Sequence, residues 1–218
     1  MARLTWDEIG ERFYETGIDH GVLYIPDVGG IYATGVSWNG LISVTESPSG
    51  AEPSAQYADN IKYLNLYSAE EFAATLEAFT YPPEFQAFDG LGEPAGAAGM
   101  AVGQQSRGVF GLSYRTIVGN DLEANDHAYK LHLVYGCQAS PSEKAFTTVN
   151  DSPEPVPLSW EIATTPAPMT GFKPTSLITV DSRAADPTAL SALEDTLYGE
   201  LGDPSLPTPD EVVALLTP

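Results

Sequence analysis

Four segments of the chain alternate apolar and polar side chains with a period of two. They span residues 36–45, 110–118, 129–137 and 156–162. In the second segment, Phe110, Leu112 and Tyr114 share one side, while Ser113 and Arg115 occupy the other. This period is typical of an antiparallel β-strand with one face on a core and one face in water. The chain therefore has to bury one face of a sheet.

Weaker strand patterns lie at residues 20–25, 56–66, 144–149 and 176–181. At least seven strands separated by Gly- and Pro-rich turns predict a mainly β fold, an antiparallel sandwich or barrel. Trp38 and Trp160 fall on the apolar sides of their segments and are predicted core residues.

One helix is expected inside the β-rich region, over residues 68–81. Ser68 can cap it, and Glu71 three residues later completes a capping box. Phe72, Leu76 and Phe79 then form one apolar stripe before Pro82 and Pro83 end the helix. A helix of about twelve residues is marginal alone, so this one is predicted to pack on the sheet as a flanking helix.

The C-terminal segment has a helical character. Asp186-Pro187 and Thr208-Pro209 each combine a cap with proline at the first helical position, and Glu211 completes a capping box. We therefore divide the chain into an N-terminal arm (1–19), a β-domain (20–173) and a small strand–helix appendage (174–218).

Two stretches are rich in small residues, 46–55 and 89–107. We expect them, with the N-terminal arm, to become ordered at interfaces between copies, because small residues allow close backbone approach. The alternative is plain surface flexibility. The candidate interface residues are Gly50, Pro53, Gly92, Gly96, Gly99 and Met100.

The charge balance is strongly acidic. Nine Lys and Arg face thirty Asp and Glu, a formal net charge of −21. Such a surface repels phosphate backbones and anionic lipids, which disfavours a specific nucleic-acid binder. The N-terminus has no secretion signal and no segment is apolar enough for a membrane span, so a soluble protein without membrane insertion is expected. Solubility alone is the simpler explanation of the charge.

The sequence contains no convincing chemical motif, so we predict neither an enzyme nor a cofactor. Cys137 is the only cysteine and lies on the apolar side of its strand, which favours a buried, inert thiol. Residues 121–132 miss the glycine and the final glutamate of a calcium loop. His127 and His132 are five apart on one strand, so they point to opposite faces and cannot share a metal.

Several longer stretches resemble the major tail proteins of siphophages, especially those that infect actinobacteria. The similarity is carried, in order, by QYADNIKYLNLYSAEEFAATLEAFTYPPEF (56–85), GVFGLSYRTIVGND (108–121), YKLHLVYGCQASPSEKAFTTVNDSPEPVPLSWEI (129–162), LEDTLYG (193–199) and PTPDEVVALL (207–216). The resemblance implies a tail-tube β-sandwich that assembles into hexameric rings, stacked into a tube that conducts the genome. It also implies a virion location, with assembly in the host cytoplasm.

The resemblance further implies the partners: other copies of the chain, a tape-measure protein, the tail terminator and distal tail proteins, and genomic DNA passing without specific binding. An acidic bore would let DNA slide without sticking. Asp59 and Glu161, on polar strand faces, are the candidate lumen residues; an outer solvated face is equally compatible.

Three other interpretations remain open. The main alternative is a β-sandwich module that binds host glycans, for which exposed Tyr or Trp on a sheet face would be the sign. A hydrolase with a carboxylate pair and a capsid decoration protein are the others. Electron microscopy of the purified protein separates these classes.

Overall fold

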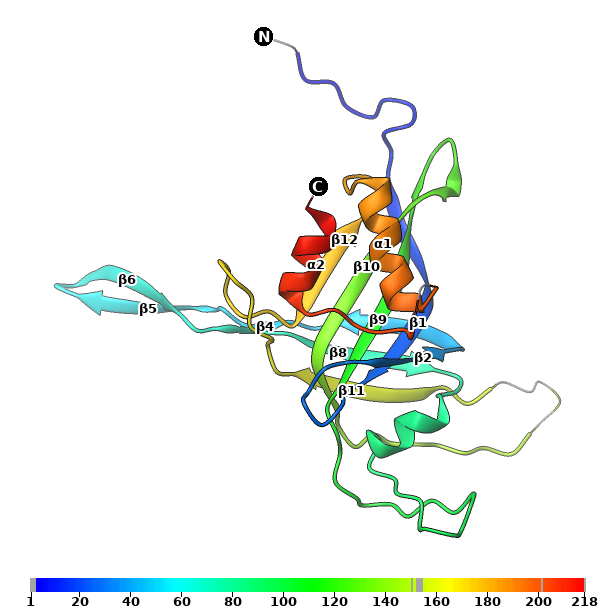
Figure 1. The fold of residues 1–218 in the computed structure, drawn as a ribbon. Helices are drawn as coiled ribbons and strands as arrows, with labels where there is room; N and C mark the ends of the chain where they lie inside the picture. The colour runs from blue at the N-terminus through cyan, green and yellow to red at the C-terminus, as the bar shows by residue number, and fades with distance from the viewer. Residues whose placement is uncertain (1–2, 150, 152–154, 201, 218) are drawn as a thin grey trace.

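The computed structural model describes residues 3–149, 151, 155–200 and 202–217. The chain is mainly β, with antiparallel strands and two C-terminal α-helices, which confirms the predicted fold class (Figure 1). The elements are β1 (Tyr14–Ile25), β2 (Thr34–Trp38), β3 (Leu41–Glu46), β4 (Ser49–Gly50), β5 (Pro53–Ala58), β6 (Ile61–Tyr67), β7 (Glu70–Glu71), β8 (Ala73–Ala78), a 3-10 helix (Pro83–Ala87), β9 (Phe110–Asn120), β10 (Ala124–Ala139), β11 (Leu158–Thr164), β12 (Leu177–Asp181), α1 (Pro187–Tyr198) and α2 (Pro209–Leu216).

The main sheet has the strand order β2-β1-β9-β10-β11-β8-β3, and β12 pairs with β10 as well. The two end strands, β2 and β3, are consecutive in the chain and are joined by Asn39 and Gly40. The sheet therefore curls until its ends meet at this short turn. The residues expected to form one strand, 36–45, are in fact two strands in different layers, because Gly40 takes a positive φ of 78° there.

The longest strand, β10, has two different partners along one of its edges. Lys130–Val134 pair with β12, whereas Cys137–Ala139 pair with β11. Gly136 lies between the two segments with φ 63°, and a Cβ there would come within 2.1 Å of the Thr165 carbonyl oxygen. A glycine is required at this point because the two halves of the strand diverge into two layers.

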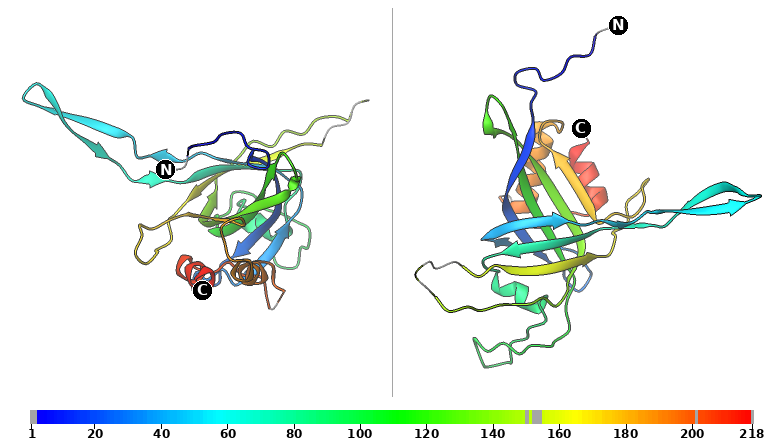
Figure 2. Two further views of the ribbon diagram at one scale, coloured as in Figure 1. Left: turned by 90° about the horizontal axis from the view of Figure 1, so that it is seen from above. Right: turned by 180° about the vertical axis from the view of Figure 1, so that it is seen from behind.

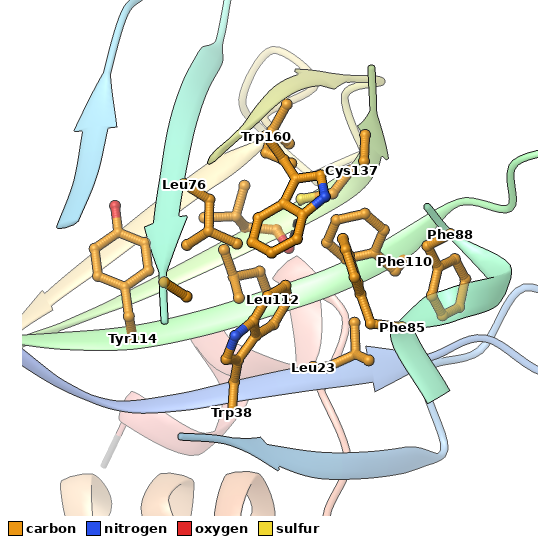
Figure 3. Close-up of a cluster of buried hydrophobic side chains, with 14 residues drawn as sticks. Leu23, Trp38, Leu76, Phe85, Phe88, Phe110, Leu112, Tyr114, Cys137 and Trp160 are labelled. Carbon is orange, nitrogen blue, oxygen red and sulfur yellow. Dashed lines mark hydrogen bonds between the residues drawn. The ribbon is translucent and has the colours of Figure 1, made fainter. Parts of the chain in front are cut away.

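The first core lies between the two layers of the curled sheet (Figure 3). Trp38, Phe85 and Trp160 are its centre, with ring centroids 4.5 Å apart for Trp38–Phe85 and 5.2 Å for Phe85–Trp160. Both indoles are buried, as predicted, and the Trp38 Nε1 donates to the Thr80 carbonyl at 2.9 Å. Cys137 is fully buried in the same cluster, and burial raises the pKa of its thiol.

A second core covers the opposite side of strands β1, β9 and β10. Leu190, Leu193 and Leu197 of α1 pack on Leu131 and Leu133. Fully burying one such leucine contributes about 1.5–3 kcal/mol. The expectation of one wet face is wrong for both central strands. The C-terminal segment covers the predicted polar side of β9, where Ser113 is buried, together with the Leu133 side of β10 (Figure 2). The predicted polar side of β10 lies on the opposite side, where His132 is buried and stacks on Tyr114 of the first core.

Buried hydroxyls on this second face are hydrogen-bonded to the C-terminal segment. Tyr24 donates to the Leu197 carbonyl at 3.0 Å, and Tyr135 donates to the Pro207 carbonyl at 2.9 Å. Both phenols lie inside the second core, where an unpaired hydroxyl would be costly. Residues of the predicted appendage thus share a core with the β-domain.

The helix predicted over residues 68–81 is wrong, because this segment contains strands β7 and β8. Leu76 pairs with Val44 of β3 on one side and with Trp160 of β11 on the other. Strand β8 is therefore an interior strand, and its alternate residues Ala74 and Leu76 point into the core. Tertiary pairing on both edges overrides a local capping signal that is worth only about 1 kcal/mol. The helix that flanks the sheet is α1.

Three further boundaries differ from expectation. Strand β1 begins at Tyr14, so its first residues pair with β9 where an arm to residue 19 was expected. The single strand predicted over 56–66 is a hairpin that turns at Asp59-Asn60, where both residues take positive φ. Residues 144–149 form no strand.

The C-terminal helices begin where their caps predict. The Asp186 side chain accepts from the backbone N–H groups of Thr188 and Ala189, and Thr208 and Glu211 form the capping box of α2. Of the predicted arm and appendage, residues 1–2, 201 and 218 lie outside the described part of the chain.

Candidate assembly surfaces

Residues 47–72 form a two-stranded extension that we call the hairpin arm. It continues the β3–β8 pair, since the Ser47 N–H donates to the Ala73 carbonyl, and then runs through the β4–β7 and β5–β6 pairs. It leaves the body as a long ribbon in all three views (Figures 1 and 2). The arm therefore has solvent on both faces in the isolated chain.

Large apolar side chains cover much of the arm, with exposed fractions from 40% at Leu64 to 72% at Tyr57. These side chains are Tyr57, Ile61, Tyr63, Leu64, Leu66 and Tyr67. A two-stranded hairpin is at best marginally stable in water, and a large contiguous apolar surface marks an interaction site. The arm is the strongest candidate for a contact surface in the described chain.

Two of the predicted interface residues lie on this arm. Gly50 pairs with Glu70 in the β4–β7 ladder, and its φ of 83° brings the position of a Cβ to 2.2 Å from the Ala69 carbonyl oxygen. Pro53 is the first residue of β5 and pairs with Tyr67. Residues 46–55 thus run from the end of β3 through β4 into β5, where a flexible stretch was the alternative. Their contact with another copy stays a prediction.

The outward face of β3, β8 and β11 is the second candidate, which we call the acidic sheet face. Register places Glu77 beside Ser43 and Ser159, and Thr75 beside Glu161. The full set is Ser43, Thr45, Ala73, Thr75, Glu77, Ser159, Glu161 and Ala163. Every member is small or acidic, so the face offers a polyanion no cation.

The two candidate lumen residues are not brought together. Glu161 is exposed on the acidic sheet face. Asp59 instead lies in the two-residue turn at the tip of the hairpin arm, with φ 50°. The expectation that Asp59 projects from a polar strand face is therefore wrong, because the chain reverses at that residue. Glu77, which sequence reasoning missed inside the predicted helix, lies on the same sheet face as Glu161, paired with Ser159 two residues along the strand.

The remaining candidate interface residues lie in the loop between the 3-10 helix and β9. Gly92 forms an isolated bridge with Val102, Gly96 and Gly99 take positive φ, and Met100 is 55% exposed. The base of this loop is fixed by Asp89. An interface role for these residues stays a prediction.

Asp89 is a buried carboxylate that joins two loops to the first core. It accepts from the Trp160 Nε1 at 3.1 Å and from the Lys144 Nζ at 2.5 Å, and Arg107 Nη1 lies 3.6 Å away. Its side chain is 5% exposed. A buried charge held by opposite charges and an indole N–H is a structural group, and it positions loop residues on either side of the core.

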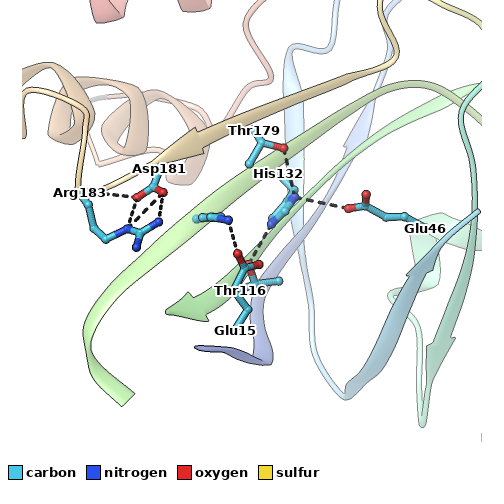
Figure 4. Close-up of polar contacts among 8 residues, drawn as sticks. Glu15, Glu46, Thr116, His132, Thr179, Asp181 and Arg183 are labelled. Atoms are coloured by element: carbon cyan, nitrogen blue, oxygen red, sulfur yellow. Dashed lines mark hydrogen bonds and ion pairs between the residues drawn. The ribbon is translucent and has the colours of Figure 1, made fainter. Parts of the chain in front are cut away.

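A polar cluster of Glu46, Tyr114 and His132 fixes the root of the hairpin arm, and Figure 4 shows its Glu46–His132 contact. Glu46 ends β3 and accepts from the Tyr114 hydroxyl at 2.7 Å. The Tyr114 ring stacks on His132 with centroids 4.7 Å apart, and His132 Nδ1 lies 3.5 Å from Glu46 Oε1. Burial lowers the pKa of His132, which favours the neutral ring.

No group of three or more His, Cys, Asp or Glu in the described part of the chain could hold a metal ion. An open, largely apolar groove of about 610 Å³ lies between the β1–β2 loop and α2 and includes Tyr32, Leu206 and Leu215. In the described residues, no helix has the length and apolarity needed to cross a bilayer.

Sequence reasoning missed the arm as a surface, although a signal was available. Residues 61–67 place large apolar side chains at both odd and even positions, and Asp59-Asn60 before them suits a two-residue turn. Such a pattern normally indicates a strand buried on both faces. Only the position of the hairpin outside the body identifies it as exposed.

Comparisons with known proteins gave fold likenesses alone. No family model and no curated protein matches the chain. One similar solved chain comes from the cryo-EM structure of the anti-feeding prophage baseplate: 9% identity, TM-score 0.38, covering 81% of this chain and 97% of that one. Another comes from the extended sheath–tube complex of the extracellular contractile injection system PVC: 11% identity, TM-score 0.34, covering 81% and 93%. Both are distant likenesses.

Proposed function

We propose that this chain is a structural tail protein that assembles with copies of itself into rings, and that the rings stack into a tube for the genome. The number of six copies in each ring comes from the resemblance of the sequence to siphophage major tail proteins. The observation that carries the proposal is the hairpin arm, whose apolar side chains need a second surface.

The apolar side chains of the arm are not buried by the fold of the single chain. Its apolar side chains stand on a ribbon two strands wide that extends away from both cores, so folding alone leaves them in water. Burial against another copy would remove several of these side chains from water, each contributing about 1.5–3 kcal/mol. A contact from one surface to a different surface of the next copy is heterologous, and such contacts close into rings or continue as filaments.

The acidic sheet face suits the bore. In a ring, strand β3 forms one end of this face, and its free edge could pair with a neighbour, which converts an aggregation hazard into a directed contact. Glu77 and Glu161 would then face the passage with small hydroxyl side chains around them. A duplex passing such a wall meets repulsion and releases no counterions, so it slides.

The partners follow from the same proposal. Within the tube the chain would enclose a tape-measure protein before the genome passes, and the ends of the tube would meet the tail terminator and distal tail proteins. Its location would be the virion tail, after assembly in the host cytoplasm. DNA would be a transient occupant and no specific ligand.

The arm can be tested with a double variant, Tyr63→Ser with Leu66→Ser. Losing two buried contacts would weaken association by about 3–6 kcal/mol, or roughly 100-fold to 20,000-fold. Val28→Ser, at a fully exposed loop position on the body, is the matched control. Sedimentation and electron microscopy at high concentration, with and without the other tail-assembly proteins, measure the outcome.

We expect the parent chain and the control to form rings or tubes and the arm variant to remain monomeric with an unchanged thermal midpoint. A parent chain that stays monomeric under all these conditions overturns the proposal. Arm variants that assemble like the parent would remove the role of the arm.

The bore is tested in assembled tubes with Glu77→Lys and Glu161→Lys together. These tubes should retain short duplex DNA in a salt-dependent way, whereas parent tubes should not. Glu84→Lys with Glu200→Lys, at two exposed positions outside the acidic sheet face, is the control. Equal DNA retention by both double variants would exclude the acidic sheet face as the lining.

The glycan-binding alternative keeps one supporting observation. Tyr57, Tyr63 and Tyr67 are exposed on the arm, and exposed aromatic rings on strands are typical of carbohydrate-binding surfaces. Trp38 and Trp160, by contrast, are core residues. A persistent monomer that binds glycans, and loses binding when these tyrosines are replaced, would favour this function over the tube.

A further inference from the structure

Six of the nine Lys and Arg side chains are already paired with carboxylates of the same chain. The pairs are Arg12–Asp121, Arg107–Asp89, Arg115–Asp19, Lys130–Glu15, Lys144–Asp89 and Arg183–Asp181. Among the described residues, Arg3, Lys62 and Lys173 have no carboxylate within ion-pair distance. These three side chains thus have no described carboxylate partner although the chain holds thirty acidic residues.

The three unpaired cations lie on three segments that project from the body. Lys62 lies near the tip of the hairpin arm, one position beyond Ile61 at the turn. Arg3 is on the extended N-terminal segment that leaves the body before β1 (Figure 1). Lys173 is in the loop between β11 and β12, which projects on the same side as the arm (Figure 2).

Each of these cations has a large exposed apolar neighbour in the sequence. Lys62 lies between Ile61 and Tyr63, which are 63% and 67% exposed. Arg3 precedes Leu4, which is 72% exposed, and Lys173 follows Phe172, which is 73% exposed. A cation beside an exposed apolar side chain combines the two features of a contact point: area to bury and a charge to orient it.

We propose that Lys62, Arg3 and Lys173 are the cationic halves of ion pairs between copies of this chain, each meeting carboxylates on a neighbour's acidic surface. The inference rests on the proposed self-assembly and specifies its chemistry. A second copy fits as the partner because it carries the complementary charge: its formal net charge is −21, and its own cations are otherwise paired internally. The unpaired cations would thus direct contact between surfaces that otherwise repel.

Lys62 gives the sharpest test because it lies far from both cores on the arm. Lys62→Gln removes the charge, and Lys62→Arg keeps it. Thr188→Glu, at an exposed position on the first turn of α1, lowers the net charge by the same single unit and is the control for bulk repulsion. The critical concentration for assembly is measured by sedimentation from about 50 to 500 mM salt.

At low salt we expect Lys62→Gln to raise the critical concentration by roughly two- to fivefold, the range for one exposed ion pair. Lys62→Glu should raise it by more than tenfold, because it places like charges together. Lys62→Arg should match the parent and Thr188→Glu should change it little. The gap between the parent and Lys62→Gln should close at high salt, since screening removes the pair. Lys173→Gln and Arg3→Gln should behave in the same way.

Two different failures can be told apart. If the parent chain does not assemble, the proposed function falls, and this inference falls with it. If the parent assembles but Lys62→Gln and Lys62→Glu match it at every salt concentration, the ion pairs are refuted while self-assembly stands. A shift in Lys62→Gln equal to that in Thr188→Glu would also refute them, because net charge alone would then explain the effect.

Discussion

Gly136 is the residue on which the two-layer architecture depends most directly, and Gly136→Ala tests this. The backbone φ of 63° costs an L-residue about 1–2 kcal/mol. A Cβ would stand 2.1 Å from the Thr165 carbonyl oxygen, so that backbone has to move. The Thr165 N–H donates to the Gly136 carbonyl at 3.0 Å, and losing that bond costs about 0.5–1.5 kcal/mol.

Overpacking adds about 1–3 kcal/mol, so the total loss is about 3–6 kcal/mol. This is a large part of the stability of a typical domain, which is about 5–15 kcal/mol. Gly171→Ala is the matched control, because Gly171 also has a positive φ, of 80°, but an added Cβ meets no described atom within 4 Å. The control should therefore lose only the conformational share, about 1–2 kcal/mol.

Urea unfolding followed by tryptophan fluorescence measures both variants, because Trp38 and Trp160 lie in the first core and report on its packing. We expect Gly136→Ala to unfold at clearly lower urea than Gly171→Ala, or to fail to fold where the control folds. Equal midpoints for the two variants would refute the reasoning, since the clash with Thr165 would then have no energetic effect.

Two further predictions concern buried polar groups. Asp89→Ala removes the acceptor of the Lys144 ammonium and the Trp160 N–H and the opposite charge beside Arg107, so urea unfolding should show a loss of about 3–5 kcal/mol. Asp89→Asn can still accept from the indole and should lose less; an equal loss would contradict this account. Burial lowers the pKa of His132 below its usual 6.5; Lys130 lowers it further, while Glu46 and Glu15 oppose the shift. The neutral ring therefore contributes stability that is fully present above pH 6.5 and is lost as the pH falls through the lowered pKa. The thermal midpoint of His132→Gln should therefore fall less steeply than that of the parent below pH 6.5, and identical slopes would show that His132 takes no part.

The strands with strong alternation were predictable because their pattern reflects a physical requirement. Residues 110–118 and 129–137 are strands, and both indoles on the predicted apolar sides are core residues. The C-terminal caps were predictable for a similar reason, since Asp186 and Thr208 satisfy backbone N–H groups a few residues away. Such signals are local and need no knowledge of distant residues.

The wrong predictions also have one cause, which is contact between residues far apart in the chain. Residues 73–78 carry helix-compatible side chains behind a capping signal, yet they pair with β3 on one edge and β11 on the other. Which segment meets which is a long-range matter, and a local cap cannot outweigh two ladders. The same holds for Asp59, whose direction depended on a turn that divides one predicted strand into two.

The sequence by itself determined the class of the fold, its two capped helices, its buried tryptophans and its acidic balance, because periodicity, caps and charge are properties of neighbouring residues or of composition. Only the tertiary structure decided that the tyrosines of the hairpin arm lie in water, that Glu77 and Glu161 share one sheet face, and that three cations have no carboxylate partner within the described part of the chain. These are relations between residues far apart in the chain, and they depend on which surfaces the folded chain covers. Apolar residues that would be core in one arrangement become a contact surface in another because burial is decided by the whole molecule.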